Sequence, residues 1–186
     1  MYPVYQTEGF VVSIKNTGES NQYISVYTKE FGLIKGLLYS VRKIEGKLRN
    51  RFQLFSYIHV ECIYGLSGWR FIHAHTCQYI PVSRFNDFSR IAQLVTRLCS
   101  GEEKNEMLFV TLVEYFSLLK EISNSEIADL ECVAVFRMLY HLGYMNPKDN
   151  LEGLIDSPFY ESMKVSRAFQ ADCIEAINTS LRETHL

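Results

Sequence analysis

The residues with the clearest chemistry in this 186-residue sequence are basic and lie close together. Residues 35–51 hold six cations and a single acid, Glu45. Such a local concentration of positive charge attracts phosphates, and binding releases the counterions condensed on a nucleic acid. The alternative is a solvated loop whose charges serve solubility. The candidate phosphate contacts are Lys35, Arg42, Lys43, Lys47, Arg49 and Arg51.

Aromatic residues flank these cations and add a second kind of contact. Tyr39 lies among the cations, and Phe52 and Phe55 follow them. An exposed aromatic ring stacks on a nucleic-acid base whatever the base is. Lysine and arginine contacts to phosphate also carry no base information. The segment therefore predicts nucleic-acid binding with little sequence choice, in which Tyr39 supplies a stacking surface if its ring is exposed.

His73-Ala74-His75-Thr76-Cys77 is the other group of residues with chemical potential. Residues two apart on a strand share a face, so three side chains of metal-ligand type would point the same way. The three positions span roughly 13 Å along a strand. That is too far for all of them to reach one tetrahedral ion at about 2 Å. We expect a partly exposed strand face here and no metal.

Catalytic motifs are absent from the sequence, which has no G-x-S-x-G, no H-E-x-x-H and no G-x-x-x-x-G-K. The acids of the second half are too dispersed for a two-metal nuclease site. His141 lies beside an apolar stripe, as a histidine at the edge of a core does. We therefore expect no catalytic residue and no cofactor, and predict that the chain is not an enzyme.

Charge divides the chain into two parts that the overall net charge of −2 conceals. Residues 1–80 carry nine Lys and Arg against five Glu, a net charge of +4. Residues 81–186 carry ten Lys and Arg against sixteen Asp and Glu, a net charge of −6. This asymmetry predicts two domains with different partners, 1–80 and 81–186.

The first eighty residues have the pattern of short strands. Residues 23–28 alternate, with Tyr23, Ser25 and Tyr27 on one face and Ile24 and Val26 on the other. Turn residues such as Gly18 and Gly65 separate the segments. Five such segments predict a small Greek-key barrel of the oligonucleotide-binding (OB) type. The predicted strands are 9–15, 23–28, 33–39, 52–64 and 69–80.

After Pro81 the apolar spacing becomes helical. Stripes over 108–122 and 132–142 predict two helices, the first with Asn105 as its N-cap. A weaker helix is predicted over 88–99, and a last stripe covers 165–181. Ser157-Pro158 looks like an N-cap followed by proline at the first helical position. The fold class is therefore α+β, a five-stranded OB-fold barrel followed by a C-terminal α-helical domain.

The five cysteines are scattered, odd in number and never spaced C-x-x-C. This usage fits reduced thiols in a cytosolic protein better than a disulfide framework. No uninterrupted run of 18 apolar residues is present, so no membrane-spanning helix is expected. The first nine residues lack the basic start and apolar stretch of a signal peptide.

An ordered series of motifs in this sequence resembles the bacterial DNA repair and recombination family RecO. Lys35-Gly36 and Arg42-Lys43 fall where that family has a small-residue and basic segment. Residues 136–147 resemble its central helix, with the ending Leu142-Gly143-Tyr144-x-x-Pro147. The clearest matching runs are Thr7-Glu8-Gly9-Phe10-Val11-Val12, Gly18-Glu19-Ser20, Tyr27-Thr28-Lys29-Glu30-Phe31-Gly32 and Arg51-Phe52-Gln53-Leu54-Phe55-Ser56-Tyr57-Ile58-His59-Val60-Glu61.

The resemblance implies an OB-fold barrel that binds single- and double-stranded DNA and anneals complementary strands. It also implies contact with the tail of single-stranded-DNA-binding protein and with RecR, acting indirectly on the RecA filament. It implies a cytoplasmic, nucleoid-associated protein. The resulting hypothesis is a non-enzymatic recombination mediator. The alternative is a protein-interaction scaffold with little DNA binding of its own, which the net charge of −2 would suit.

The sequence departs from the family in one respect. Many relatives carry a four-cysteine zinc module just after the position that matches Pro147, whereas residues 148–156 here contain no cysteine. We therefore expect a short form without that module. Because residues 81–186 are acidic, we assign them to protein partners and stability and not to DNA.

Overall fold

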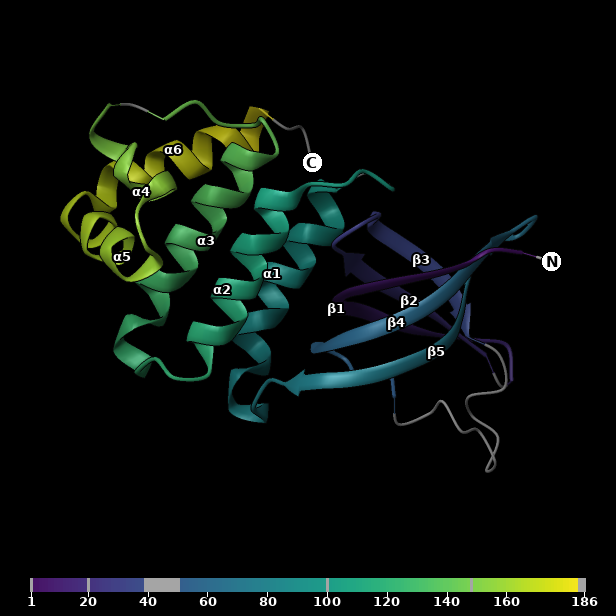
Figure 1. Ribbon diagram of the computed structural model, residues 1–186. Coiled ribbons are helices and arrows are strands. Elements are labelled where there is room, and N and C mark those ends of the chain that lie inside the picture. Colours follow the sequence, from purple (N-terminus) through teal and green to yellow (C-terminus); the bar gives the residue numbers. More distant parts are fainter. Residues whose placement is uncertain (1, 20, 39–50, 100, 148, 184–186) are drawn as a thin grey trace. The chain divides into compact units, whose positions relative to one another are not determined.

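The computed structural model describes residues 2–19, 21–38, 51–99, 101–147 and 149–183 (Figure 1). The residues form two compact units. The first comprises residues 1–85 and 92–104, and the second comprises residues 86–91 and 105–186. The first unit holds all the described strands, and the second holds most of the helical residues.

Five strands close into a barrel in the first unit (Figure 1). Their order around the barrel is β1-β2-β3-β5-β4, and only the β3–β5 pair is parallel. This closed five-stranded barrel, followed by helices, confirms the predicted α+β class and the OB-type architecture. The strands are β1 (Val4–Thr17), β2 (Asn21–Thr28), β3 (Gly32–Leu38), β4 (Ser56–Gly65) and β5 (Gly68–Tyr79).

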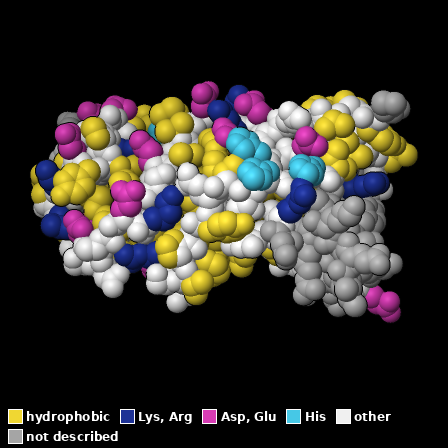
Figure 2. Space-filling model, turned by 60° about the horizontal axis from the view of Figure 1, so that its bottom comes forward, with side chains coloured by type: hydrophobic (Ala, Val, Ile, Leu, Met, Phe, Trp, Pro, Cys, Tyr) yellow, Lys and Arg dark blue, Asp and Glu magenta, His cyan; other side chains and the backbone are white. Residues whose placement is uncertain are grey.

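The barrel core follows from the alternation of each strand. Ile24 and Val26 of β2 are fully buried, as the alternation predicts. The β-branched and aromatic residues that fill the interior favour pleated, half-buried strands. The outward positions of β4 and β5 carry polar side chains, and Figure 2 shows histidines gathered on the barrel surface. The core also includes Val11, Ile34, Leu38, Ile58, Val60, Phe71 and Ala74.

A tight turn with a left-handed residue joins β2 to β3. The Thr28 hydroxyl donates to the Gly32 carbonyl at 2.9 Å and accepts the Phe31 N–H at 3.1 Å. Gly32 itself has φ of +64°. A Cβ there would lie 2.1 Å from the carbonyl oxygen of Glu103. Gly32 thus needs glycine both for its backbone conformation and for the close approach of a second backbone.

The second unit is a helical domain, as predicted. Asn105 caps α2, since its side-chain oxygen accepts the Leu108 N–H at 2.9 Å. In the described ranges, 3-10 turns precede α1 (Val82–Arg84), α3 (Asn124–Glu126) and α4 (Asp149–Leu151). Within the described ranges, no helix is long and apolar enough to span a membrane. The helices are α1 (Phe85–Leu98), of which only residues 86–91 belong to this unit, and α2 (Glu106–Leu119), α3 (Ile127–His141), α4 (Gly153–Asp156), α5 (Phe159–Ala168) and α6 (Gln170–Glu183).

Two predictions about the last helical stripe were wrong in detail. The stripe over 165–181 belongs to two helices, because Phe169 leaves the helical conformation at φ −119° and ψ 37°. The N-cap of α5 is Pro158 and not Ser157, and Ser157 is extended. The carbonyl of Ser157 instead accepts hydrogen bonds from Arg137 and Ser162, which holds it outside the helix.

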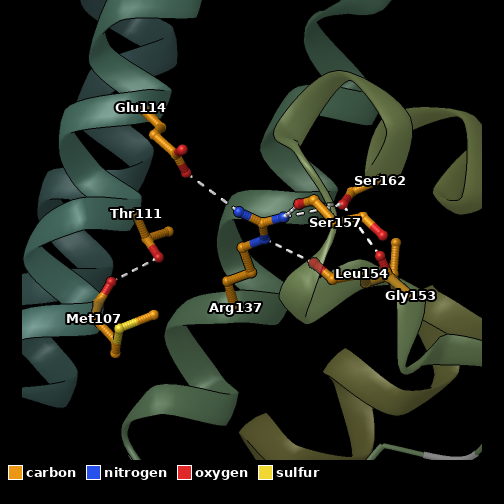
Figure 3. A network of polar contacts seen from close by, with 8 residues as sticks. All are labelled: Met107, Thr111, Glu114, Arg137, Gly153, Leu154, Ser157 and Ser162. Carbon is orange, nitrogen blue, oxygen red and sulfur yellow. Dashed lines mark hydrogen bonds and ion pairs between the residues drawn. The ribbon is translucent and has the colours of Figure 1, made fainter.

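The Arg137 guanidinium organises the C-terminal part of the helical domain (Figure 3). Its side chain on α3 is only 7% exposed. It donates to the carbonyls of Leu154 at 2.7 Å and of Ser157, and to the Ser162 hydroxyl at 2.9 Å. Glu114 on α2 accepts a further bond at 3.2 Å. One buried cation therefore ties α2, α3 and the segment from α4 to α5 together.

Arg137→Met should reduce the free energy of unfolding by about 3 kcal/mol or more, because buried acceptors lose their donor. Denaturant unfolding followed by circular dichroism measures the loss. Arg182→Met is the matched control, since its side chain near the end of α6 is exposed. Equal destabilisation by the two variants would contradict the organising role of Arg137.

Gly32→Ala should destabilise the barrel more than Gly18→Ala does. Both glycines have positive φ, +64° and +55°, so each alanine carries a conformational cost of about 1 kcal/mol. Only Gly32 faces another backbone, whereas a Cβ at Gly18 meets nothing within 4 Å. The difference in midpoint of thermal unfolding isolates that contact. If the two variants unfold at the same temperature, the close approach is not a constraint.

Candidate nucleic-acid interface

The structure describes only part of the predicted basic segment. Lys35 lies on β3 with its side chain exposed, and Arg51 is half-buried just before a turn that leads to β4. The two residues mark the limits of the segment, whose remaining predicted contacts lie outside the described residues. Those contacts are Tyr39, Arg42, Lys43, Lys47 and Arg49.

The outer face of β1, β2 and β3 adds two residues to Lys35. Lys15 of β1 is paired directly with Tyr23 of β2. Lys35 of β3 is paired with Ser25, two residues further along β2 from Tyr23. Opposite residues of an antiparallel pair share a face, and so do residues two apart on one strand. Lys15, Tyr23 and Lys35 therefore point to the same side of the barrel, and we call them the lysine–tyrosine face.

This face has free positive charge and an accessible ring. Tyr23 is 51% exposed, and both lysines are exposed. Neither Lys15 nor Lys35 makes an ion pair with any residue that the structure describes. The next outward pair along these two strands, Ser13 and Ser25, consists of small residues. Neighbouring strands lie about 4.8 Å apart, so the three side chains fall within the reach of a short stretch of nucleic acid.

Lys15 and Tyr23 were missed as contacts by the sequence reasoning. The signal for Tyr23 was present, because the alternation over 23–28 already set it opposite the buried Ile24. The signal for Lys15 was hidden by a β-bulge. Val11 pairs with Val26 and Ser13 with Ser25, so Val12 is an extra residue that reverses the alternation.

Phe52 and Phe55 do not supply stacking surfaces, which corrects the expectation for them. Phe52 is 4% exposed and packs in the barrel core with its ring centroid 5.3 Å from that of Phe71. Phe55 is 8% exposed, with its ring edge against Phe85. The predicted strand over 52–64 begins only at Ser56. Phe55 adopts φ of +61° in the turn before it.

The other edge of β1, which pairs with β4, contributes to a second outer face. Glu8 of β1 is paired with His59 of β4, which is paired with His75 of β5. These three residues form one row across the strands, and Gln6, Glu61 and His73 form the next outward-facing row. These two rows line a groove of about 560 Å³, together with Thr7, Lys29, Glu30 and Val60.

Glu8 is held by two donors at one end of this groove. The Tyr57 hydroxyl donates to the Glu8 carboxylate at 2.5 Å, and the Lys29 ammonium lies 3.1 Å from its other oxygen. The Tyr57 hydrogen bond, with help from Lys29, lowers the pKa of Glu8 below its usual value. Burial and the hydrogen bond to Glu8 raise the pKa of Tyr57. Glu8 is therefore fixed as a carboxylate at neutral pH.

His73 and His75 share the outer face, but Cys77 departs from their row. Tyr57 pairs with Gln78 and Ile58 with Thr76, so Cys77 is the extra residue of a bulge. His73 is also engaged, since Arg51 lies 3.0 and 2.9 Å from its two ring nitrogens. Among the described residues, no three His, Cys, Asp or Glu side chains are placed to hold a metal ion.

Comparison with known proteins identifies the barrel region. Residues 1–67 match the family model described as recombination protein O N terminal. The chain is 30% identical over 139 residues to a protein of Dehalococcoides mccartyi, covering 72% of this chain and 53% of that one. It is 24% identical over 152 residues to a protein of Thermoanaerobacter sp., covering 78% and 60%. A protein of Gloeothece citriformis is 25% identical over 126 residues, covering 65% and 44%.

All three relatives carry the name DNA repair protein RecO. The chain spans about half the length of these curated relatives. The family match covers most of the closed barrel, and the alignments with relatives extend beyond it. This chain belongs to the RecO family.

Proposed function

We propose that this chain is a mediator of DNA repair and recombination that binds single- and double-stranded DNA and anneals complementary strands. In this role it helps to load a recombinase onto DNA coated by single-stranded-DNA-binding protein. Its relatives named DNA repair protein RecO support the repair role. The observation that carries DNA binding is the lysine–tyrosine face, where Lys15 and Lys35 flank an exposed Tyr23.

On the lysine–tyrosine face, a single strand has both of the contacts that it needs. Phosphates approach the ammonium groups of Lys15 and Lys35, and their binding releases condensed counterions. A base stacks on the Tyr23 ring, a contact that every base can make. OB-fold barrels bind oligonucleotides on the face of β2 and β3. The predicted cations Arg42, Lys43, Lys47 and Arg49 follow β3 in the sequence.

Annealing on such a surface requires no nucleophile and no metal. Contacts to phosphate and to the flat side of a base leave the pairing edges of the bases accessible. Charge on the protein reduces the repulsion between two strands that are held close together. The chain acts in this proposal as a non-enzymatic mediator, and cleavage of DNA by the purified protein would contradict it.

The helical residues are proposed to bind proteins. Residues 81–186 have a net charge of −6, which disfavours contact with phosphates. The partners proposed for the whole protein are the tail of single-stranded-DNA-binding protein and RecR, with an indirect effect on the RecA filament. The competing proposal is a scaffold that binds these proteins and hardly binds DNA, in line with the overall net charge of −2. Tight binding of the acidic tail peptide without measurable DNA binding would favour the scaffold.

Lys15→Ala with Lys35→Ala should flatten the salt dependence of single-stranded-DNA binding. Each phosphate contact contributes about 0.7 to the slope of log K against log salt, so two lysines account for about 1.4. The change is measured by fluorescence anisotropy of a labelled oligonucleotide at salt concentrations from about 50 to about 200 mM. Replacing Arg42, Lys43 and Lys47 with alanine should lower the slope by about 2.

Lys164→Ala is the matched control, because it removes one exposed lysine from the acidic helical domain and should leave the slope unchanged. DNA binding that is absent in the unmodified chain, or that does not depend on salt, would refute the proposed function.

Tyr23→Ala should weaken single-stranded-DNA binding by about 1–3 kcal/mol through the loss of one stacked base. The salt slope should stay constant, since no charge is removed. Tyr23→Phe keeps the ring and should bind like the unmodified chain, which separates stacking from a hydroxyl hydrogen bond. The same anisotropy titration measures both variants. Equal affinities of Tyr23→Ala and Tyr23→Phe would show that no base stacks on this ring.

A further inference from the structure

Three exposed histidines occupy the outer face of β4 and β5, away from the lysine–tyrosine face. His59 and His75 are directly opposite each other, and His73 lies two residues from His75 on the same strand. All three line the groove of about 560 Å³. Figure 2 shows histidine side chains close together on the barrel, with a cationic side chain beside them. We call His59, His73 and His75 the histidine face.

The fixed charges around the histidine face nearly cancel. Glu8 pairs with Lys29 at 3.1 Å, and Glu30 pairs with Lys104 at 3.0 Å. Glu61 accepts a hydrogen bond from the Gln6 amide at 3.0 Å but has no ion pair among the described residues. The positive charge of Arg51, which lies beside His73, offsets the negative charge of Glu61. The exposed Arg70 occupies the next outward position of β5 beyond His73. The Tyr57 hydroxyl, bound to Glu8, and the exposed Cys77 thiol lie on the same two strands, β4 and β5.

Protonation of the histidines therefore decides how strongly positive this face is. Its carboxylates (Glu8, Glu30 and Glu61) and fixed cations (Lys29, Arg51, Arg70 and Lys104) leave a net charge of about +1 when the imidazoles are uncharged. Imidazoles change charge between about pH 5 and pH 8, the range in which carboxylates and lysines do not. Full protonation would bring the face to about +4, because each histidine adds one charge. A groove open to solvent then becomes attractive to an anion.

The contact between Arg51 and His73 adds to this change. The guanidinium has only donors, so it can bond to an imidazole nitrogen only when that nitrogen is unprotonated. A protonated His73 has no acceptor and places a second positive charge against Arg51. Protonation thus breaks the contact and releases a guanidinium whose fork of donors matches phosphate oxygens.

We propose that the histidine face is a second, proton-dependent contact for the phosphodiester backbone of DNA. The proposal rests on the proposed function, since it assumes that the same barrel binds DNA through the lysine–tyrosine face. The ligand is the backbone and not the bases, because Tyr57, whose ring centroid lies 6.4 Å from that of His59, is half-buried and tied to Glu8. Because β1 belongs to both faces, one barrel would then hold two segments of DNA strand.

Binding of a labelled single strand at pH 8.0 and pH 5.8, in about 0.1 M salt, tests the proposal. A phosphate contact with a slope of about 0.7 is worth about fivefold in affinity at that salt concentration. The unmodified chain should therefore bind about tenfold or more tightly at the lower pH. His59→Gln with His75→Gln should lose most of this gain and keep the affinity at pH 8.0. His59→Lys with His75→Lys should bind tightly at both pH values.

His141→Gln is the control, because it removes a histidine of the helical domain and should keep the full pH effect. Circular dichroism at both pH values confirms that each variant is folded. Binding that is unchanged between the two pH values, or a pH effect that survives in His59→Gln with His75→Gln, would overturn the histidine proposal while DNA binding itself stands. Absence of binding at both pH values would instead refute the proposed function.

Discussion

Strand β1 is hydrogen-bonded to β2 along one edge and to β4 along the other, and this double pairing determines what the barrel presents to solvent. The pairing with β2 places Lys15 beside Tyr23. The pairing with β4 places Glu8 beside His59. Both faces depend on the register of one strand, because a shift by one residue would exchange every inward and outward side chain.

A single extra residue in β1 makes the two registers compatible with one core. Val11 is fully buried, and uninterrupted alternation from it would point Ile14 outward and Lys15 inward. The bulge at Val12 reverses this, so Ile14 packs against the core and Lys15 reaches solvent. A buried, unpaired ammonium would be costly, so the bulge both completes the core and creates the positive face.

The helical domain depends on a buried charge in a different way. Burial lowers the pKa of Arg137, yet an arginine remains charged at any physiological pH. The charge is retained because carbonyls, a hydroxyl and the Glu114 carboxylate surround it, and the guanidinium also lies 4.5 Å from the Phe159 ring centroid. Such a network fixes the path of the chain between α4 and α5, where apolar spacing alone does not define a helix boundary.

The sequence predicted those features that repeat along the chain and missed those that depend on one residue. The alternation of Ile24 and Val26 and the cap at Asn105 were correct, because strand period and capping chemistry are local. Phe52 and Phe55 were misassigned, since neighbours in sequence to a basic segment can be core residues in space. Bulges and the break at Phe169 interrupt a period without a signal in composition.

In the proposed function, the distribution of charge lets one small barrel attract DNA without choosing a sequence. Lys15 and Lys35 are single ammonium groups beside short serines, and lysine contacts to phosphate carry no base information. The histidines on the other side of β1 lie among carboxylates that already have donors, so their own charge is the variable one. On such a barrel, the fixed cationic face would attract a first strand at any physiological pH. Attraction for a second strand would then depend on the solution conditions, as strand annealing requires when repulsion between two backbones must be overcome.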